Sequence, residues 1–153
     1  FYELSIESLL NARDTESLEK LMSEIPPDPE EYAYQAVMYA LETLEAVKDY
    51  KMGDRHLSVA VGIEVGPVAI GDLNGRLGAL TAMGDAMNLA ARLQGLANSN
   101  EVVIGPNCHQ RLEGYRRNTL ASHLPFTIEP GGEARLKGYD KPIQYFLVKQ
   151  RSA

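Results

Sequence analysis

Residues 57–65 alternate strictly between large apolar side chains and small or polar ones. The apolar positions are Leu57, Val59, Val61, Ile63 and Val65. A period of two predicts a β-strand, because successive side chains of a strand point to opposite faces. The residues between them are mostly small, which indicates that both faces of the strand are covered. We therefore expect a central strand in a sheet packed on both sides.

A second segment, residues 85–97, has the helical period instead. Its apolar positions form one stripe: Ala86, Leu89, Ala90, Leu93, Leu96 and Ala97. Asp85, Asn88 and Arg92 lie beside this stripe on a shared polar flank, because they are spaced by about one turn each. The sequence therefore predicts an amphipathic helix that presents three polar side chains in a row.

The rest of the chain predicts short elements around these two. Asp28 and Pro29 suit the start of a helix, as cap and first residue. The further expected elements are helices over 5–25, 29–48 and 106–112, a loop at 52–55, strands over 68–70, 80–83, 101–104 and 143–148, and a hairpin joining 126–128 to 134–136. This order predicts a single domain over 1–153 with one sheet and helices packed on it, of the α/β or α+β class.

Composition excludes several classes of function. The chain has 153 residues and a net charge of −6, and its basic residues do not cluster, which argues against a nucleic-acid-binding surface. Cys108 is the one cysteine, so an internal disulfide and a cysteine-rich zinc site are both excluded. Cys108 itself is expected to be a small buried residue. The apolar stretches are too short for a membrane span.

Four motifs stand in a fixed order along the second half of the chain. Residues 84–93 read GDAMNLAARL and resemble the GDxVNxAARL signature of class III adenylyl and guanylyl cyclases. Residues 61–68 (VGIEVGPV) are similar to the family's GIHxGPV segment, with Glu64 in place of the usual histidine. Residues 101–105 (EVVIG) and 136–138 (LKG) resemble its later strand and lysine motif. The resemblance extends over about residues 28–149, and 113–133 match loosely.

The resemblance implies a fold and a reaction. The expected fold is α+β, a ferredoxin-like palm with a central, mostly antiparallel sheet. The expected reaction is the conversion of ATP to cyclic AMP and pyrophosphate. The resemblance assigns Asn88 to the ribose, Arg92 to the phosphates and Lys137 to the triphosphate. It places Thr81 at the base edge, where threonine leans toward adenine.

The residue types suit these roles on physical grounds. An amide such as Asn88 can bond a ribose oxygen and hold the sugar. A guanidinium one turn later, at Arg92, offers phosphate oxygens a planar fork of donors. Donors that are already aimed at developing negative charge contribute strongly to catalysis. The alternative for each residue is an ordinary solvated surface position, and Asp85 is expected to cap its helix rather than to bind metal.

The resemblance also implies two Mg or Mn ions held by two aspartates, and the segments that carry those aspartates in the family do not occur in this sequence. Three explanations stay open: sequence omitted from the chain, a truncated protein, or a degenerate domain. The family pattern further implies a homodimer with shared active sites. We expect a cytoplasmic domain, excised from a longer protein whose membrane attachment the sequence leaves open.

Other functions compete with the adenylyl cyclase hypothesis. The first is a catalytically inactive cyclase-homology domain that serves dimerisation or nucleotide sensing. The second is a guanylyl cyclase, because the hairpin that carries the family's base-reading lysine is not in the sequence. A diguanylate cyclase of related palm fold is disfavoured, since no GGDEF-like segment occurs.

Overall fold

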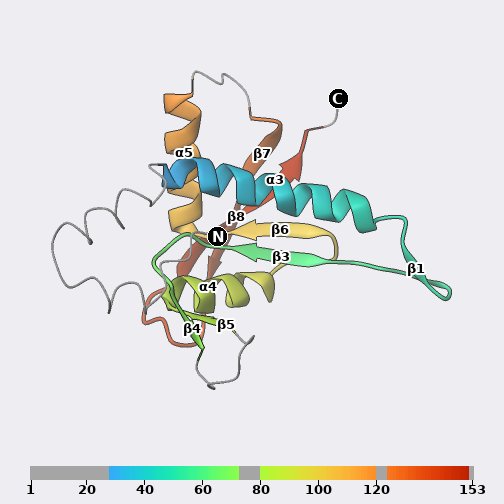
Figure 1. Ribbon diagram of the computed structural model, residues 1–153, viewed down its shortest axis with the longest axis horizontal. Coiled ribbons are helices and arrows are strands. Elements are labelled where there is room, and N and C mark those ends of the chain that lie inside the picture. Colours follow the sequence, from blue (N-terminus) through green and yellow to red (C-terminus); the bar gives the residue numbers. More distant parts are fainter. Residues whose placement is uncertain (1–27, 73–79, 120–123, 152–153) are drawn as a thin grey trace, which may run out of the picture.

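The computed structural model describes residues 28–72, 80–119 and 124–151. The helix expected over 5–25 lies outside these residues, so that prediction is not tested. The described elements are a long helix, two small hairpins, a four-stranded sheet and two further helices (Figure 1). Their packing confirms the expected α+β class: three helices cover a mixed sheet.

The first described helix is α3 (Pro29–Val47), close to the range expected from the sequence. Asp28 caps it, because its Oδ1 atom accepts a hydrogen bond of 2.8 Å from the Glu30 backbone N–H. Proline suits the first helical position, where the missing N–H costs nothing. The helix buries one face, formed by Ala33, Val37, Ala40 and Leu41.

The main sheet has the strand order β3-β6-β8-β7. The strands are β3 (Ala60–Ile63), β6 (Glu101–Ile104), β7 (Phe126–Ala134) and β8 (Ile143–Gln150). β3 pairs in parallel with β6, whereas the β6–β8 and β8–β7 pairs are antiparallel. A sheet that is mostly antiparallel was expected, and two of these three pairings are.

The strand expected at 57–65 is shorter than predicted and lies elsewhere in the sheet. Within the described residues β3 is an edge strand, so the prediction of a central strand is wrong for them. The small residues did indicate correctly that both faces are covered. Figure 1 shows β3 and β6 between α3 on one side and α4 (Asp85–Gln94) on the other. The alternation of apolar and small residues indicates that both faces of the strand are covered. It does not indicate whether the strand is central or at the edge of the sheet.

The core has two parts, one on each face of the sheet. The larger cluster joins α3 and α5 (Pro106–Asn118) to the strands through Val102, Ile104, Phe126 and Phe146, among others. The smaller cluster joins α4 to the opposite face through Leu89, Leu93 and Val103. Successive residues of β6 therefore pack against different helices, because successive side chains of a strand point to opposite faces of the sheet.

Two short antiparallel hairpins complete the described fold. β1 (Lys51–Met52) and β2 (Arg55–His56) pair where a loop was expected, and Gly53 adopts φ +64° between them. Glycine takes this conformation without the steric cost other residues bear. β4 (Ala69–Asp72) pairs with β5 (Leu80–Met83), as the sequence suggested for two short strands.

The hairpin expected around residues 129–132 is absent from the described structure. β7 instead runs straight through this segment and pairs with β8 along its whole length, with an irregularity between Pro130 and Gly132. Gly131 lies so close to the Tyr145 ring that an added Cβ would meet it at 2.3 Å, and Gly132 has φ +126°. Proline and two glycines here form a bulge within one strand rather than a turn between two.

Candidate functional site

The predicted polar flank lies on α4, which is seated directly on β3. A Cβ at Gly62 would lie 2.2 Å from the Ala90 carbonyl oxygen and 2.3 Å from the Gln94 nitrogen, so no larger residue fits between helix and strand. Leu89 and Leu93 are buried beneath the helix. The apolar stripe therefore faces the sheet, and Asn88 and Arg92 lie on the flank beside it.

The structure brings Arg92 close to the turn that carries Lys137. A Cβ at Gly138 would lie 3.8 Å from Nη2 of Arg92, so the guanidinium lies alongside the backbone next to Lys137. The Nε atom of Arg92 is buried and has no hydrogen-bond partner among the described residues. A buried donor without a partner is costly, so Arg92 keeps bonding capacity that the described chain does not use.

The other three predicted site residues lie in different parts of the structure. Asn88 is exposed on the first half of α4, one turn before Arg92. Lys137 is exposed between β7 and β8. The backbone of Thr81 pairs with Gly71 in the β4–β5 hairpin, while its side chain lies outside the described part of the structure. The structure therefore gathers Asn88, Arg92 and the Lys137 turn on one side of α4.

The prediction that Asp85 caps its helix is wrong. Gly84 holds the cap position, without a side-chain hydrogen bond, and Asp85 is the first helical residue. A carboxylate in the first turn still interacts favourably with the helix dipole. Gly84 is required where it stands, because it has φ +157° and an added Cβ would lie 2.7 Å from the Pro67 carbonyl oxygen.

Glu64, a residue without an expected role, caps α5. Its Oε1 atom accepts hydrogen bonds of 2.8 Å from the Cys108 N–H and 2.7 Å from the Val65 N–H. The natural cap position holds Gly105, which has no side chain to offer. Burial raises the pKa of the Glu64 carboxyl, against the lowering effect of its backbone donors. The contact spans 44 residues, so no local sequence signal reveals it.

We expect the stability of the Glu64→Gln variant to fall less with rising pH than the stability of the wild type. Because burial raises the folded-state pKa of Glu64, its proton favours folding; this contribution is full below the unfolded-state pKa and is lost as the pH rises through the folded-state pKa. Glutamine keeps an acceptor for α5 but does not ionise. Urea unfolding from pH 4 to pH 7 should show the variant gaining stability relative to the wild type. Parallel curves for the two proteins would contradict this assignment.

Cys108 is fully buried, as expected, directly beside the Glu64 cap. Burial, and to a lesser extent the Glu64 carboxylate, raise the pKa of its thiol to about 12. The reactive form of cysteine is the thiolate, which is scarcely populated at such a pKa. Cys108 is therefore a packing residue and not a nucleophile.

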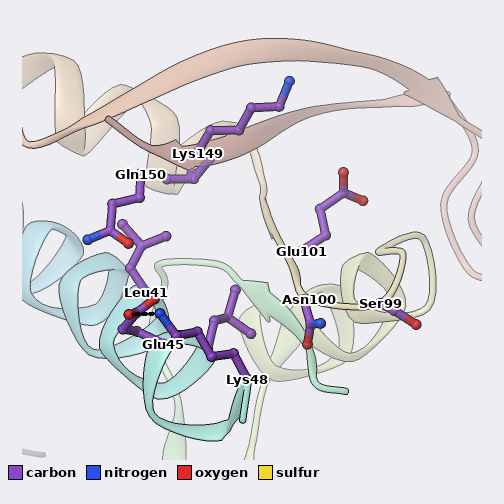
Figure 2. Close-up of a pocket in the computed structure, with 10 residues that line it drawn as sticks. Leu41, Glu45, Lys48, Ser99, Asn100, Glu101, Lys149 and Gln150 are labelled. Carbon is purple, nitrogen blue, oxygen red and sulfur yellow. Dashed lines mark hydrogen bonds and ion pairs between the residues drawn. The ribbon is translucent and has the colours of Figure 1, made fainter. Parts of the chain in front are cut away.

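A cavity at the other end of the sheet holds none of the predicted site residues. This cavity lies between α3, the start of β6 and the end of β8 (Figure 2). Its volume is about 380 Å³. Its charged side chains are bonded within the described chain: Lys48 to Glu45, Lys149 to Glu129 at 2.6 Å, and Glu101 to Asn98 at 2.9 Å. Because none of the predicted site residues lines it, this cavity is not the candidate site.

A smaller cavity lies behind the first turn of α4. It has a volume of about 270 Å³ and is lined by Glu64, Asp85, Asn107 and Tyr139, together with Val65, Gly66, Pro67, Ala86 and Leu89. Asn88, Arg92 and Lys137 are not among its walls. The candidate site is therefore the open flank of α4 facing the Lys137 turn, and not an enclosed pocket.

The described residues do not fit a two-metal site. They contain no group of three or more histidine, cysteine or carboxylate side chains arranged to hold a metal ion. Of the carboxylates near α4, Glu64 accepts hydrogen bonds from backbone N–H groups, and Asp85, which lines the same cavity, is the one acidic residue in the first turn of α4. Among residues 28–72, 80–119 and 124–151, none of the helices has the length and apolar character that a membrane span needs.

Comparison with known proteins agrees with the motifs. Residues 20–149 match the family described as the adenylate and guanylate cyclase catalytic domain. The chain is 25% identical over 131 residues to the guanylate cyclase soluble subunit beta-2 of Rattus norvegicus, covering 84% of this chain and 18% of that subunit. The match therefore concerns one domain of a much longer relative.

Solved structures give the same result for the fold. The guanylate cyclase domain of RhGC from Catenaria anguillulae, in complex with GTP, superposes with a TM-score of 0.67 at 26% identity, covering 84% of this chain and 64% of that one. The adenylate cyclases of Trypanosoma brucei in their monomeric state give a TM-score of 0.63 at 17% identity, over 77% and 63% of the two chains. The present chain thus spans less than two thirds of these domains. With the family match extending over most of its length, the chain belongs to the class III adenylate/guanylate cyclase catalytic domains.

Proposed function

We propose that this chain supplies the sugar- and phosphate-binding half of a nucleotidyl cyclase site that converts ATP to cyclic AMP and pyrophosphate. The observation that carries the proposal is the position of the Arg92 guanidinium beside the Lys137 turn. Its Nε atom is buried without a partner among the described residues, and its Nη2 atom lies beside the Lys137 turn. Anionic oxygens placed between Arg92 and Lys137 would satisfy both cations.

In the proposed reaction the ribose 3′-hydroxyl loses its proton to solvent as its oxygen bonds to the α-phosphorus. The bond from that phosphorus to the bridging oxygen breaks, and pyrophosphate leaves with the bonding electron pair. Asn88 holds the ribose so that the 3′-oxygen stays in line with the leaving group. Arg92 stabilises the charge that grows on the phosphate oxygens, and Lys137 binds the departing pyrophosphate. Membership of the family implies the use of divalent metal ions, and the described residues offer no site for them.

The proposal also names the purine base of the substrate, which is adenine in ATP and guanine in GTP. The resemblance places Thr81 at the base edge, where threonine leans toward adenine. GTP is the second candidate, because two of the relatives named above are guanylate cyclases and one of them is in complex with GTP. Product formation from ATP and from GTP, with Mg²⁺ or Mn²⁺, decides between them. Turnover of GTP alone would replace the adenylyl proposal by the guanylyl one.

A non-catalytic role is the alternative of a different class. A domain that serves nucleotide sensing or dimerisation would bind a nucleoside triphosphate without releasing pyrophosphate. The assay is therefore run with a parallel binding measurement on the same preparation. Binding with neither cyclic AMP nor cyclic GMP formed would overturn the catalytic proposal and support the sensing role.

We also propose a homodimer in which the α4 flank faces a second copy. Three apolar side chains are exposed around the start of α4: Val68 at 40%, Met83 at 50% and Met87 at 44%. Exposed apolar groups gathered at one place are typical of an interface. Their position next to Asn88 supports active sites that are completed by the partner subunit.

Replacing Met87 by aspartate is expected to weaken the dimer on the order of 30-fold, because a buried methionine contact is exchanged for a desolvated charge. Sedimentation velocity over a concentration series measures the effect. Met52→Asp is the matched control, since Met52 is 76% exposed in β1, away from α4. Equal dimer affinity for the Met87 variant and the wild type would rule out this face.

A further inference from the structure

We propose that Tyr139 is a positioning residue that fixes the 136–139 turn on α4, so that Lys137 and Arg92 act on the same triphosphate. This inference rests on the proposed function and deepens it. Tyr139 follows the LKG motif directly and is not one of the residues to which the family resemblance gave a role. Its contacts reach α4 on one side and the turn on the other.

The ring of Tyr139 is anchored beneath α4. It is half-buried and packs against the cluster formed by Leu89, Leu93 and Val103. Leu136, three residues earlier, packs against the same cluster. Both ends of the turn are therefore held in the apolar core under the helix, and burial of two such side chains opposes any movement away from it.

The hydroxyl of Tyr139 adds a directional tie to the helix. Its Oη atom donates a long, solvent-exposed hydrogen bond of 3.4 Å to the backbone oxygen of Asp85. Asp85 is the first residue of α4 and lies one turn before Asn88. This bond joins the turn to the end of the helix that carries the predicted ribose-binding amide, which apolar packing alone does not specify.

The turn itself is closed around Lys137. The Tyr139 N–H donates a hydrogen bond of 3.1 Å to the Leu136 carbonyl oxygen. Gly138 adopts φ +92°, a conformation that other residues rarely take, and its backbone lies beside the Arg92 guanidinium. Lys137 is thus the exposed residue of a turn whose neighbours on both sides are fixed.

These contacts hold the backbone of Lys137 in one position, although its side chain is flexible. A lysine side chain has many rotamers, and its ordering on a phosphate is costly in entropy. A fixed backbone limits this cost to the side chain itself. Loss of the Tyr139 hydroxyl frees the turn from the start of α4, so Lys137 meets the phosphates less often while Arg92 stays in place.

The test is a double-mutant cycle in nucleotide binding with the whole protein. Tyr139→Phe, Lys137→Ala and the double variant are titrated with a fluorescent ATP analogue and with adenosine. We expect Tyr139→Phe to weaken binding of the ATP analogue about fivefold, the effect of one hydrogen bond. In the Lys137→Ala background the same change should have less than a twofold effect, because the two residues act through one contact. Adenosine, which has no phosphates, should bind all Tyr139 variants equally.

A matched control and a second variant complete the design. Tyr145→Phe removes the hydroxyl of another tyrosine packed on the same cluster and should leave binding unchanged. Leu136→Val loosens the other anchor of the turn and should reproduce the Lys137-dependent loss. Equal effects of Tyr139→Phe with and without Lys137, or an equal loss of adenosine binding, would overturn this inference alone. Absence of ATP-analogue binding by the wild type would instead overturn the proposed function.

Discussion

Replacing Arg92 by alanine is expected to lower kcat for cyclic nucleotide formation about 100- to 1,000-fold, as removal of one preorganised donor to a developing anion does in other enzymes. The fold should survive, because the guanidinium makes no hydrogen bond through its buried Nε atom within the described residues. The change in KM should be small by comparison, since the charge that Arg92 meets is greatest in the transition state.

Two further variants separate charge from geometry at this position. Arg92→Lys keeps the charge but loses the planar fork, so its kcat should lie between those of the wild type and the alanine variant. Arg111→Ala removes an exposed arginine from α5 and should leave kcat unchanged. The assay is product formation from ATP and GTP at saturating substrate. Unchanged turnover by Arg92→Ala would remove Arg92 from the proposed mechanism.

The polar flank of α4 could be predicted from the sequence because it depends on local periodicity. The apolar stripe fixes which side of the helix faces the sheet, and Asn88 and Arg92 then lie beside it whatever the rest of the fold is. The helix is shorter than predicted, since it ends at Gln94 and not at Ala97. Helix ends depend on turn geometry, which the apolar pattern does not contain.

The contacts across the chain could not be predicted in this way. Glu64 caps a helix 44 residues further on, and the Arg92 guanidinium lies beside Gly138. Both contacts result from the order of strands in the sheet, to which side-chain alternation is insensitive. The motif at 136–138 indicated the second contact only through resemblance, and the structure supplies the geometry: a positive φ at Gly138 and a tie from Tyr139 to α4.

Replacing Gly62 by alanine is expected to destabilise the domain by about 3 kcal/mol, the upper range for overpacking. The added Cβ would lie 2.2 Å from the Ala90 carbonyl oxygen and 2.3 Å from the Gln94 nitrogen, and both are backbone atoms that no rotamer change can move. The whole of α4 must therefore shift outward from β3. For a domain of this size the melting temperature should fall by about 10 °C.

The shift of α4 links this packing contact to the proposed chemistry. Asn88 and Arg92 would move with the helix, whereas Lys137 belongs to the connection between β7 and β8, so the spacing of the cations would change. A misplacement of about 1 Å can cost on the order of 100-fold in rate. Gly62→Ala should thus lower kcat even well below its melting temperature, while Ser58→Ala, an exposed change just before β3, should alter neither property. If Gly62→Ala lost stability but kept its kcat, the seating of α4 would matter for folding and not for the site.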